Sequence, residues 1–403
     1  MRLVFVNRYF HPDHSATSQM LSDLAFFLAG AGHEVRVVTS GQRYDDPAAT
    51  LPPHERVDGV EVFRVRTTRF GRDKLLGRAA DYATFYLAAG WRLWRIARAG
   101  DSVVAKTDPP LISVAAGMVT RWRGARLVNW VQDVFPEVAE ALGVRALAGP
   151  QSGLLRWLRN GAFKRAAANV VLGQRMAEVV ARAGAQASGI RVIPNWADME
   201  AIHPVAVADN PLRREWGLEG HFVVCYSGNM GRAHEFDTIL DAAERLAVTA
   251  AGMRFLFIGG GAQRRLIEDA AQRRRLANVQ FRPYQERDKL SLSLGVGDVH
   301  LVSLRAELEG YMFPSKLYGI LAAGRPTVFV GDPQGEIALL VEREGIGVAV
   351  AHGDAVGLAD TLTQLADDRS LRGAMGRRAR ALLCERYDKG IALKAWLRLL
   401  QEL

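Results

Sequence analysis

Residues 298–331, DVHLVSLRAELEGYMFPSKLYGILAAGRPTVFVG, contain two short apolar runs with a helical stretch between them. The runs at 298–304 and 325–331 are rich in β-branched and aliphatic residues, which is typical of buried strands. The stretch at 316–323 has the length and composition of a helix, and Gly324 follows it directly. A strand, a helix and a second strand in this order predict two parallel strands joined by a crossover helix.

The same alternation extends along the whole chain. We predict further strands at 3–6, 32–40, 60–65, 102–106, 125–133, 169–173, 221–228, 253–260 and 279–283, with helical stretches between most of them. Short hydrophobic strands that alternate with helices form parallel sheets covered on both faces. A segment with prolines and no clear period, 200–215, separates two such series. The sequence therefore predicts an α/β fold with two doubly wound, Rossmann-like domains, residues 1–200 and 201–385, facing a cleft.

The composition is ordinary for a soluble globular protein. The chain has 403 residues, of which 49% are hydrophobic and 24% charged, and this excludes a disordered or collagen-like protein. Only two cysteines, Cys225 and Cys384, are present, which argues against a disulfide framework. The opening MRLVFVNRYF lacks the pattern of a signal peptide, and no apolar run reaches about 18 residues. We therefore expect a cytoplasmic protein.

The net charge of +9 is distributed unevenly. Nearly all of the excess lies in the first 200 residues, which include the basic run at 56–78. Such an asymmetry favours an anionic partner, namely phospholipid headgroups, a phosphorylated substrate or nucleic acid. A generally arginine-rich, solvated surface is the alternative.

Two segments rich in aromatic and basic residues, 82–98 and 154–165, indicate contact with a membrane surface. Aromatic and leucine faces bordered by arginine are typical of helices that lie in a membrane interface. We therefore expect peripheral binding to the anionic inner face of the membrane, through Arg72, Lys74, Arg78, Trp91, Trp94 and Trp157. The alternative is that these helices pack on the first sheet and turn their arginines toward water.

Glycine-containing loops follow two strands of the second half. Open parallel sheets bind ligands at the carboxyl ends of their strands. Gly228 and Gly231 permit close approach of backbone, and Arg232 is within reach of a phosphate bound there; a plain strand-to-helix turn is the alternative. The glycines at 259–261 lack the G-x-G-x-x-G spacing of a dinucleotide site, so we interpret them as tight-turn glycines needed for packing.

The loop at 307–316 contains the strongest candidate for an anion site. Ser315 is placed to cap the following helix, and Lys316 lies one residue inside it. Free N–H groups, the helix dipole and a lysine together predict a diphosphate site. Glu307 and Glu309, just upstream, are candidates for binding sugar hydroxyls. A capped helix with an early lysine is also a common chance feature.

These motifs resemble a known enzyme family. YSGNMGR at 226–232, MFPSKLYGILAAGRPTVFV at 312–330 and IPNWAD at 193–198 look like the motifs of the family 4 retaining glycosyltransferases, which have the GT-B fold. The stretch at 7–40, NRYFHPDHSATSQMLSDLAFFLAGAGHEVRVVTS, is similar to their opening strand, loop, helix and strand. The resemblance covers essentially the whole chain.

Two further stretches resemble one branch of this family in particular. VVAKTDPP at 103–110 and WVQDVFPE at 130–137 resemble the bacterial branch that contains N-acetyl-L-fucosamine transferases of O-antigen assembly and related capsule enzymes. The resemblance implies that the N-terminal domain takes the acceptor and the C-terminal domain binds the nucleotide-sugar. It also implies that the C-terminal helix, in 386–403, crosses back to the N-terminal domain.

The resemblance also assigns roles to single residues. The loop of His14, Ser15, Ala16 and Thr17 stands where the family has a glycine-rich loop facing the donor phosphates and the acceptor, and serine and alanine here replace glycines. Asp133 falls near the position of a residue beside the transferred sugar. The implied catalytic residues are His14, Asp133, Arg232 and Lys316. The implied donor-binding residues are Ser15, Thr17, Gly231, Arg232, Tyr284, Glu309, Ser315 and Lys316, with backbone at Tyr284 holding the base.

One family pattern is missing. Counted back from Gly324, the two glutamates of the family's Glu-x7-Glu pattern fall on Tyr311 and Gly319, and neither is acidic. The second glutamate would bind the ribose hydroxyls. We therefore expect that another residue supplies this contact or that the donor binds more weakly than in typical members.

The expected chemistry needs neither a metal nor a cofactor. Arg232 and Lys316 can neutralise a leaving diphosphate, and the sequence has no Asp-x-Asp signature. The family resemblance implies that the leaving phosphate oxygen takes the acceptor proton. The branch points to UDP with an N-acetylhexosamine or its 6-deoxy form as donor, and to a lipid-linked sugar or polysaccharide precursor as acceptor.

Two other functions are compatible with parts of the sequence. A nucleotide-sugar 2-epimerase shares the two-domain fold, but it needs catalytic carboxylates in the cleft. A basic nucleic-acid-binding protein would explain the charge, but no zinc spacing or other short nucleic-acid signature is present. We therefore expect no nucleic acid partner.

Overall fold

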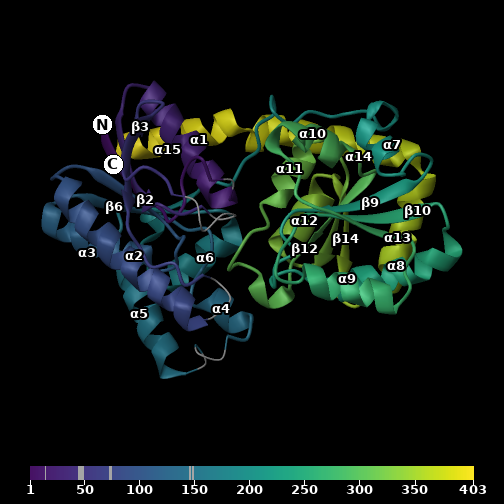
Figure 1. The fold of residues 1–403 in the computed structure, drawn as a ribbon, viewed down its shortest axis with the longest axis horizontal. Coiled ribbons are helices and arrows are strands. Elements are labelled where there is room, and N and C mark those ends of the chain that lie inside the picture. Colours follow the sequence, from purple (N-terminus) through teal and green to yellow (C-terminus); the bar gives the residue numbers. More distant parts are fainter. Residues whose placement is uncertain (14, 44–49, 72–74, 145–146, 148) are drawn as a thin grey trace. The chain divides into compact units, whose positions relative to one another are not determined.

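The computed structural model describes residues 1–403 except 14, 44–49, 72–74, 145–146 and 148. The chain forms two compact units. The N-terminal unit comprises Met1–Pro194, Gly310–Phe313 and Ala392–Leu403, and the C-terminal unit comprises Asn195–Glu309 and Pro314–Ile391. Each unit contains one sheet with helices packed on it (Figure 1), as predicted from the alternation of strands and helices.

The N-terminal sheet has the strand order β3-β4-β2-β1-β5-β6-β7-β8. Its strands are β1 (Arg2–Val6), β2 (Glu34–Ser40), β3 (His54–Val57), β4 (Val60–Val65), β5 (Ser102–Lys106), β6 (Arg126–Trp130), β7 (Ala168–Val171) and β8 (Ile190–Val192). All neighbours are parallel except β3, which is antiparallel to β4. The sequence did not predict β3 or β8. Both are short edge strands with partly exposed side chains, so they lack the apolar run on which the other predictions depended.

The helices of the N-terminal unit are α1 (Ala16–Gly30), α2 (Leu75–Ile96), α3 (Ile112–Arg123), α4 (Glu137–Ala141), α5 (Pro150–Arg165) and α6 (Gln174–Arg182). All of them except the short α4 contain buried residues. Phe85 and Leu93 of α2 and Ile112 of α3 share one core cluster with Val4 and Val103 of the sheet. Burying a side chain of this size contributes about 1.5–3 kcal/mol. Within the described residues, no helix has the length and apolar character needed to cross a membrane.

The C-terminal sheet has the order β11-β10-β9-β12-β13-β14, and all of its pairs are parallel. Its strands are β9 (Phe222–Ser227), β10 (Met253–Ile258), β11 (Val279–Arg282), β12 (Val299–Ser303), β13 (Thr327–Gly331) and β14 (Gly347–Ala351). Its helices are α7 (Pro211–Glu215), α8 (Asp237–Thr249), α9 (Arg264–Arg273), α10 (Leu290–Gly295), α11 (Lys316–Ala322), α12 (Glu336–Arg343), α13 (Ala355–Asp367) and α14 (Arg369–Leu382). The sequence missed β14, a five-residue edge strand, and α7, a five-residue helix within the segment expected to be aperiodic.

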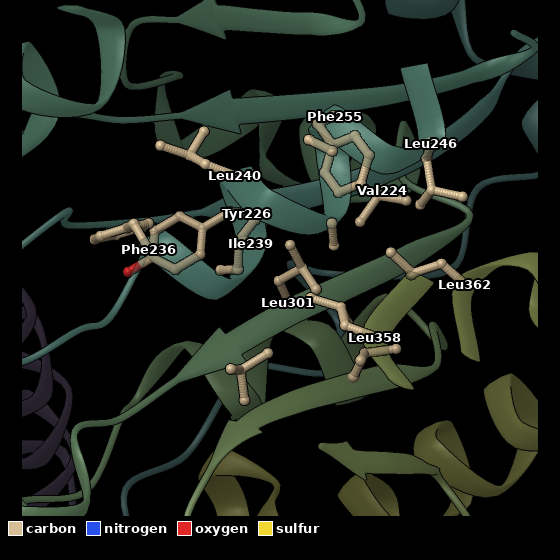
Figure 2. Close-up of a cluster of buried hydrophobic side chains, with 14 of the residues drawn as sticks. Val224, Tyr226, Phe236, Ile239, Leu240, Leu246, Phe255, Leu301, Leu358 and Leu362 are labelled. Carbon is tan, nitrogen blue, oxygen red and sulfur yellow. The ribbon is translucent and has the colours of Figure 1, made fainter. Parts of the chain in front are cut away.

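One hydrophobic cluster joins the layers of the C-terminal unit. Figure 2 shows Val224, Phe255 and Leu301 from three strands in contact range of side chains from α8 and α13. Val224, Phe255 and Leu301 each have less than 2% of their surface exposed. This packing holds β9 and β12 side by side, and the loops that follow these two strands form the candidate site.

The last helix, α15 (Lys389–Glu402), begins in the C-terminal unit and continues into the N-terminal unit. Residues 392–403 belong to the N-terminal unit, and Trp396 is completely buried there. Its ring lies 4.6 Å, centroid to centroid, from that of Trp130 at the end of β6. The C-terminal helix is therefore part of the N-terminal core.

Trp396→Ala is expected to lower the free energy of unfolding by about 3–5 kcal/mol, because it leaves a large cavity against Trp130. Urea denaturation measures this. Trp91→Ala is the matched control: the side chain is 64% exposed on α2, so its loss changes the stability by about 0.5 kcal/mol or less. Equal effects of the two variants would contradict the proposed anchoring of α15.

Candidate active site

The strand order of the C-terminal sheet reverses between β9 and β12. From β9 the chain continues to β10 on one side of the sheet, and from β12 it continues to β13 on the other side. Ligands of open α/β sheets bind in the crevice that such a reversal leaves at the carboxyl ends of the two strands. The loop after β9 contains Gly228, Gly231 and Arg232, and the segment after β12 contains Glu309, Ser315 and Lys316. The fold thus brings together the two loops that the sequence singled out.

Lys316 reaches back under the loop that follows β9. Its amine donates a hydrogen bond to the Tyr226 hydroxyl and lies 3.8 Å from the centre of that ring. Its Nζ is also 3.4 Å from Nε2 of His234. Burial lowers the pKa of the Lys316 amine well below its ordinary value.

His234 and Tyr226 extend this contact into a chain of hydrogen bonds. Nδ1 of His234 donates to the carbonyl of Ser303 at 2.5 Å, which leaves Nε2 as an acceptor facing Lys316. Burial, with the charge of Lys316 as a smaller cause, lowers the pKa of His234 to about 3, so the ring is neutral. The Tyr226 hydroxyl donates to the carbonyl of Asn229 at 3.0 Å. The amine is thus linked to the backbone of the glycine loop.

The two glycine loops pack directly on each other. A Cβ at Gly259, where φ is +132°, would lie 2.2 Å from the carbonyl oxygen of Gly228, and one at Gly261 would lie 2.4 Å from Oδ1 of Asn229. The prediction that the glycines at 259–261 serve packing is confirmed. Tyr284, which is 59% exposed, covers Gly259 and Gly260 with its ring.

Arg232 and Gly231 lie at the open side of this loop. Arg232 is exposed, and within the described part of the chain its guanidinium forms no ion pair or hydrogen bond. Its five donors are therefore available to a ligand. A Cβ at Gly231 would lie 2.9 Å from Nδ2 of Asn229, so this glycine keeps the loop compact.

Ser315 does not cap α11, and this prediction was wrong. Its backbone already has helical angles, φ −64° and ψ −17°, and its side chain makes no capping hydrogen bond. An N-cap residue accepts such a bond from an extended conformation. The helix has only seven residues, Lys316–Ala322, so the electrostatic argument for this site is carried by Lys316 rather than by the helix end.

The carboxylate of Glu309 is directed at another helix. Its Oε1 accepts a hydrogen bond of 2.7 Å from the backbone N–H of Glu336, the first residue of α12. A carboxylate at a helix N-terminus stabilises the helix. In this structure Glu309 therefore has a structural partner, whereas Glu307 is exposed.

The two positions of the missing glutamates lie in different units. The carbonyl of Tyr311 accepts a hydrogen bond of 2.7 Å from the N–H of Val134 in the N-terminal unit. Gly319 lies in α11 of the C-terminal unit, where a Cβ would be 3.4 Å from a methyl group of Leu294.

The N-terminal sheet reverses its strand order between β1 and β5. Here the hydroxyl of Thr17 donates to Oδ2 of Asp108 at 3.0 Å, and the carbonyl of Asp108 accepts from the N–H of Arg8 at 2.7 Å. The hydroxyl of Ser15 donates to Asp13 at 2.5 Å. His14 lies outside the described residues. The loop after β1 is thus tied to the loop after β5 at the carboxyl edge of this sheet.

Asp133 follows β6 at the same edge of the N-terminal sheet. The residue has a side open to solvent, and its backbone forms an isolated bridge with Met312. Partial desolvation of the carboxyl by neighbouring protein atoms, with the charge of Asp108 as a smaller cause, raises its pKa to about 6. A carboxyl that titrates near neutrality at a strand end is typical of functional sites.

Sequence reasoning missed Tyr226, His234 and Lys106. Lys106 ends β5, is 1% exposed, and places its amine 3.6 Å from the centre of the Trp130 ring, with no hydrogen-bond partner among the described residues. A lysine at the end of the apolar run SVVAK was a visible signal. Tyr226 lies in the quoted motif YSGNMGR, but the sequence did not connect Tyr226 or His234 with Lys316, which is 90 and 82 residues away.

The predicted membrane-binding residues lie on two helices of the N-terminal unit. Trp91 and Trp94 of α2 are 64% and 39% exposed, and Trp157 of α5 is 70% exposed. Arg78 lies on α2, whereas Arg72 and Lys74 are outside the described residues. Side chains of this size normally pack in a core, so their exposure agrees less well with the purely structural alternative.

In the part of the chain that the structure describes, no group of three or more His, Cys, Asp or Glu side chains is arranged to hold a metal ion.

Comparison with known families agrees with this two-unit geometry. Residues 16–196 match the family described as "Glycosyl transferase 4-like domain", and residues 209–382 match "Glycosyl transferases group 1". The chain is a glycosyltransferase built from these two domains. Each match lies within one half of the chain, and the second one contains both strands, β9 and β12, of the reversal point in the C-terminal sheet.

Relatives and solved structures extend over nearly the whole enzyme. It is 28% identical to the putative colanic acid biosynthesis glycosyl transferase WcaI of Escherichia coli, over 87% of this chain and 88% of the relative. Its fold is similar to that of sucrose-phosphate synthase from Thermosynechococcus elongatus, with TM-score 0.78, 16% identity and coverage of 100% and 99%. It is also similar to Anabaena HepE in complex with UDP-glucose, with TM-score 0.73, 17% identity and full coverage of both chains. These structures share the GT-B fold.

Asp133→Asn is expected to raise the melting temperature at about pH 7.5 and to have a much smaller effect at about pH 4.5. The folded pKa of about 6 lies above the ordinary value of 3.8, so the folded state holds this proton more tightly than the unfolded chain. Ionisation of Asp133 therefore lowers the free energy of unfolding as the pH rises from about 4 to above 6. Asparagine cannot ionise, so the variant does not lose this stability. Differential scanning fluorimetry measures it, with exposed Asp360→Asn as control. A shift of equal size at both pH values would contradict the raised pKa.

Proposed function

We propose that this glycosyltransferase moves a sugar from a nucleotide-diphosphate donor to a lipid-linked or polysaccharide-precursor acceptor in surface glycan biosynthesis, with retention of configuration. The name of the Escherichia coli relative supports a role in polysaccharide assembly. The UDP-glucose bound by HepE supports a nucleotide-sugar donor. Within this class, the donor we propose is UDP-N-acetylhexosamine or its 6-deoxy form.

The position of the Lys316 amine is the main support for the proposed donor site. A lysine amine lies under the Gly228 loop, bonded to Tyr226 and near His234, and no ion pair neutralises it within the described residues. A buried amine without a carboxylate partner among the described residues favours an anionic ligand. We assign the diphosphate to Lys316 and Arg232, with close backbone approach at Gly228 and Gly231.

In this scheme these two residues stabilise the leaving group. The bond between the anomeric carbon and the diphosphate oxygen breaks, and the pair of electrons leaves on that oxygen. Arg232 and the protonated Lys316 neutralise the charge that develops there, which is the usual way in which a fixed site lowers such a barrier. The acceptor oxygen bonds to the anomeric carbon on the same face, and its proton passes to the leaving oxygen.

The N-terminal unit supplies the acceptor side of the proposal. Thr17 is held by Asp108 at the carboxyl edge of the sheet, and Asp133 follows β6 at that same edge. We assign Asp133 and His14 to positioning the sugar or the acceptor, Ser15 and Thr17 to the donor phosphates, and the backbone at Tyr284 to the base. Exposed Trp91, Trp94 and Trp157, with Arg78, support contact with the anionic inner face of the membrane.

UDP is expected to raise the melting temperature more than GDP, TDP, ADP or CMP do, because a ligand that binds only the folded state stabilises it by mass action. Lys316→Met and Arg232→Gln are each expected to weaken UDP binding about 10- to 100-fold through loss of charged hydrogen bonds. Turnover of UDP-sugars should fall as well.

Arg273→Gln is the matched control, because Arg273 is an exposed arginine of α9 in the same unit. Its UDP-dependent shift should equal that of the wild type. Full UDP binding by both Lys316→Met and Arg232→Gln would overturn the diphosphate assignment.

Activity is expected to survive EDTA nearly unchanged, because two cationic side chains perform the neutralisation that a divalent metal performs elsewhere. The measurement is the release of UDP from UDP-sugars in the presence of a lipid-linked acceptor, with and without chelator. Loss of activity that magnesium restores would refute metal-independent transfer.

A further inference from the structure

An open groove of about 730 Å³ lies between α3 and α5 on the N-terminal unit. Val114, Gly117, Met118, Thr120 and Arg121 of α3 line one side, and Trp157, Asn160, Gly161, Lys164 and Arg165 of α5 line the other, with residues 125–127 between them. The two helices pack beside each other. Neither the domain families nor the proposed donor and acceptor residues account for this groove; Trp157 is one of the residues proposed above for membrane contact, and the inference below rests on that proposal.

The groove has an apolar floor and apolar walls. Leu127 and Ala162, which are 4% and 5% exposed, form part of the floor. Met118 on α3 and Trp157 on α5 are 60% and 70% exposed. A hydrophobic channel with large uncovered apolar side chains favours a hydrocarbon ligand or an apolar partner surface.

The charged residues of the groove are all cationic. Arg121, Arg126, Lys164 and Arg165 are exposed, and among the described residues that line the groove there is no aspartate or glutamate. Across the described chain, none of these four side chains forms an ion pair. An apolar channel bordered by unpaired cations is complementary to an amphiphile with a negative head.

The groove lies at the opposite edge of the sheet from the candidate site. Arg126 is the first residue of β6, whereas Asp133 follows the last one. Five residues of strand span roughly 13 Å. A ligand in this groove therefore occupies a site separate from the acceptor residues of the same unit.

We infer that the groove between α3 and α5 is a binding site for one anionic phospholipid, with an acyl chain between Met118 and Trp157 and the phosphate against the basic rim. A second copy of this face would bring four cations against four cations, which opposes self-association. A nucleic acid backbone would match the rim but has no group to fill the apolar floor. The site would hold the N-terminal unit on an anionic leaflet independently of sugar transfer.

Binding of a single soluble lipid distinguishes such a site from adsorption to a membrane surface. We would titrate the full chain with dihexanoylphosphatidylglycerol below its critical micelle concentration, using calorimetry and native mass spectrometry. The expected result is saturable one-to-one binding, at least about tenfold tighter than that of dihexanoylphosphatidylcholine. Inorganic phosphate alone should not bind.

Gly161→Phe places a ring in the groove and is expected to weaken lipid binding about tenfold or more. A Cβ at Gly161 meets only Nη1 of Arg165, at 3.2 Å, so the helix tolerates it. Gly153→Phe is the matched control on the same helix, at an exposed position outside the groove where a Cβ meets nothing within 4 Å. Its affinity should stay at the wild-type value.

A charge-reversed variant tests the rim without filling the groove. Arg121→Glu with Lys164→Glu should remove the preference for phosphatidylglycerol, whereas Arg265→Glu with Arg273→Glu, two exposed arginines of α9, should retain it. Absence of one-to-one binding, equal binding of both lipids, or full binding by Gly161→Phe would each overturn the proposal.

Discussion

Two strand pairings, β1 with β5 and β9 with β12, fix the positions of the candidate sites. At each of them the order of a parallel sheet reverses, so the following loops turn to opposite faces and leave backbone groups uncovered between them. Thr17 and Asp108 meet at the first pairing, and Lys316 meets the loop after β9 at the second. The hydrophobic packing behind β9 and β12 keeps the second pair together (Figure 2). The position of each candidate site therefore follows from the topology of its sheet.

The C-terminal site combines a buried amine with an exposed guanidinium. Tyr226 and His234 contact the amine of Lys316, and their own hydrogen bonds fix them to the backbone of Asn229 and Ser303. Arg232, by contrast, is exposed. The proposed diphosphate site thus pairs a buried lysine, positioned by two side chains, with an arginine that is open to solvent.

Sequence patterns predicted the central strands of both sheets, because those strands are buried on both faces and form continuous apolar runs. They did not predict β3 or β8, two edge strands with partly exposed side chains and no apolar run, and they missed β14 although its sequence GVAVA is apolar. The loop of Lys316 was found because a serine and a lysine open a helix, yet Ser315 proved not to cap it. The carboxylate of Glu309, a predicted donor-binding residue, accepts a hydrogen bond from the first residue of α12. The local sequence indicates which loops contain candidate binding residues. It does not reveal which distant residue forms a hydrogen bond with each of their side chains.

The sequence by itself determined the α/β class, the two series of strands and helices, the loops with candidate anion-binding residues and the aromatic, basic helices of the first half. These features depend on local periodicity and composition, which are readable along the chain. Only the tertiary structure decided that Tyr226 and His234 hold Lys316, that Trp396 packs on Trp130, and that α3 and α5 leave a basic-rimmed groove between them. Such contacts join residues far apart in the chain, and they follow from the order in which the strands pair rather than from any local pattern.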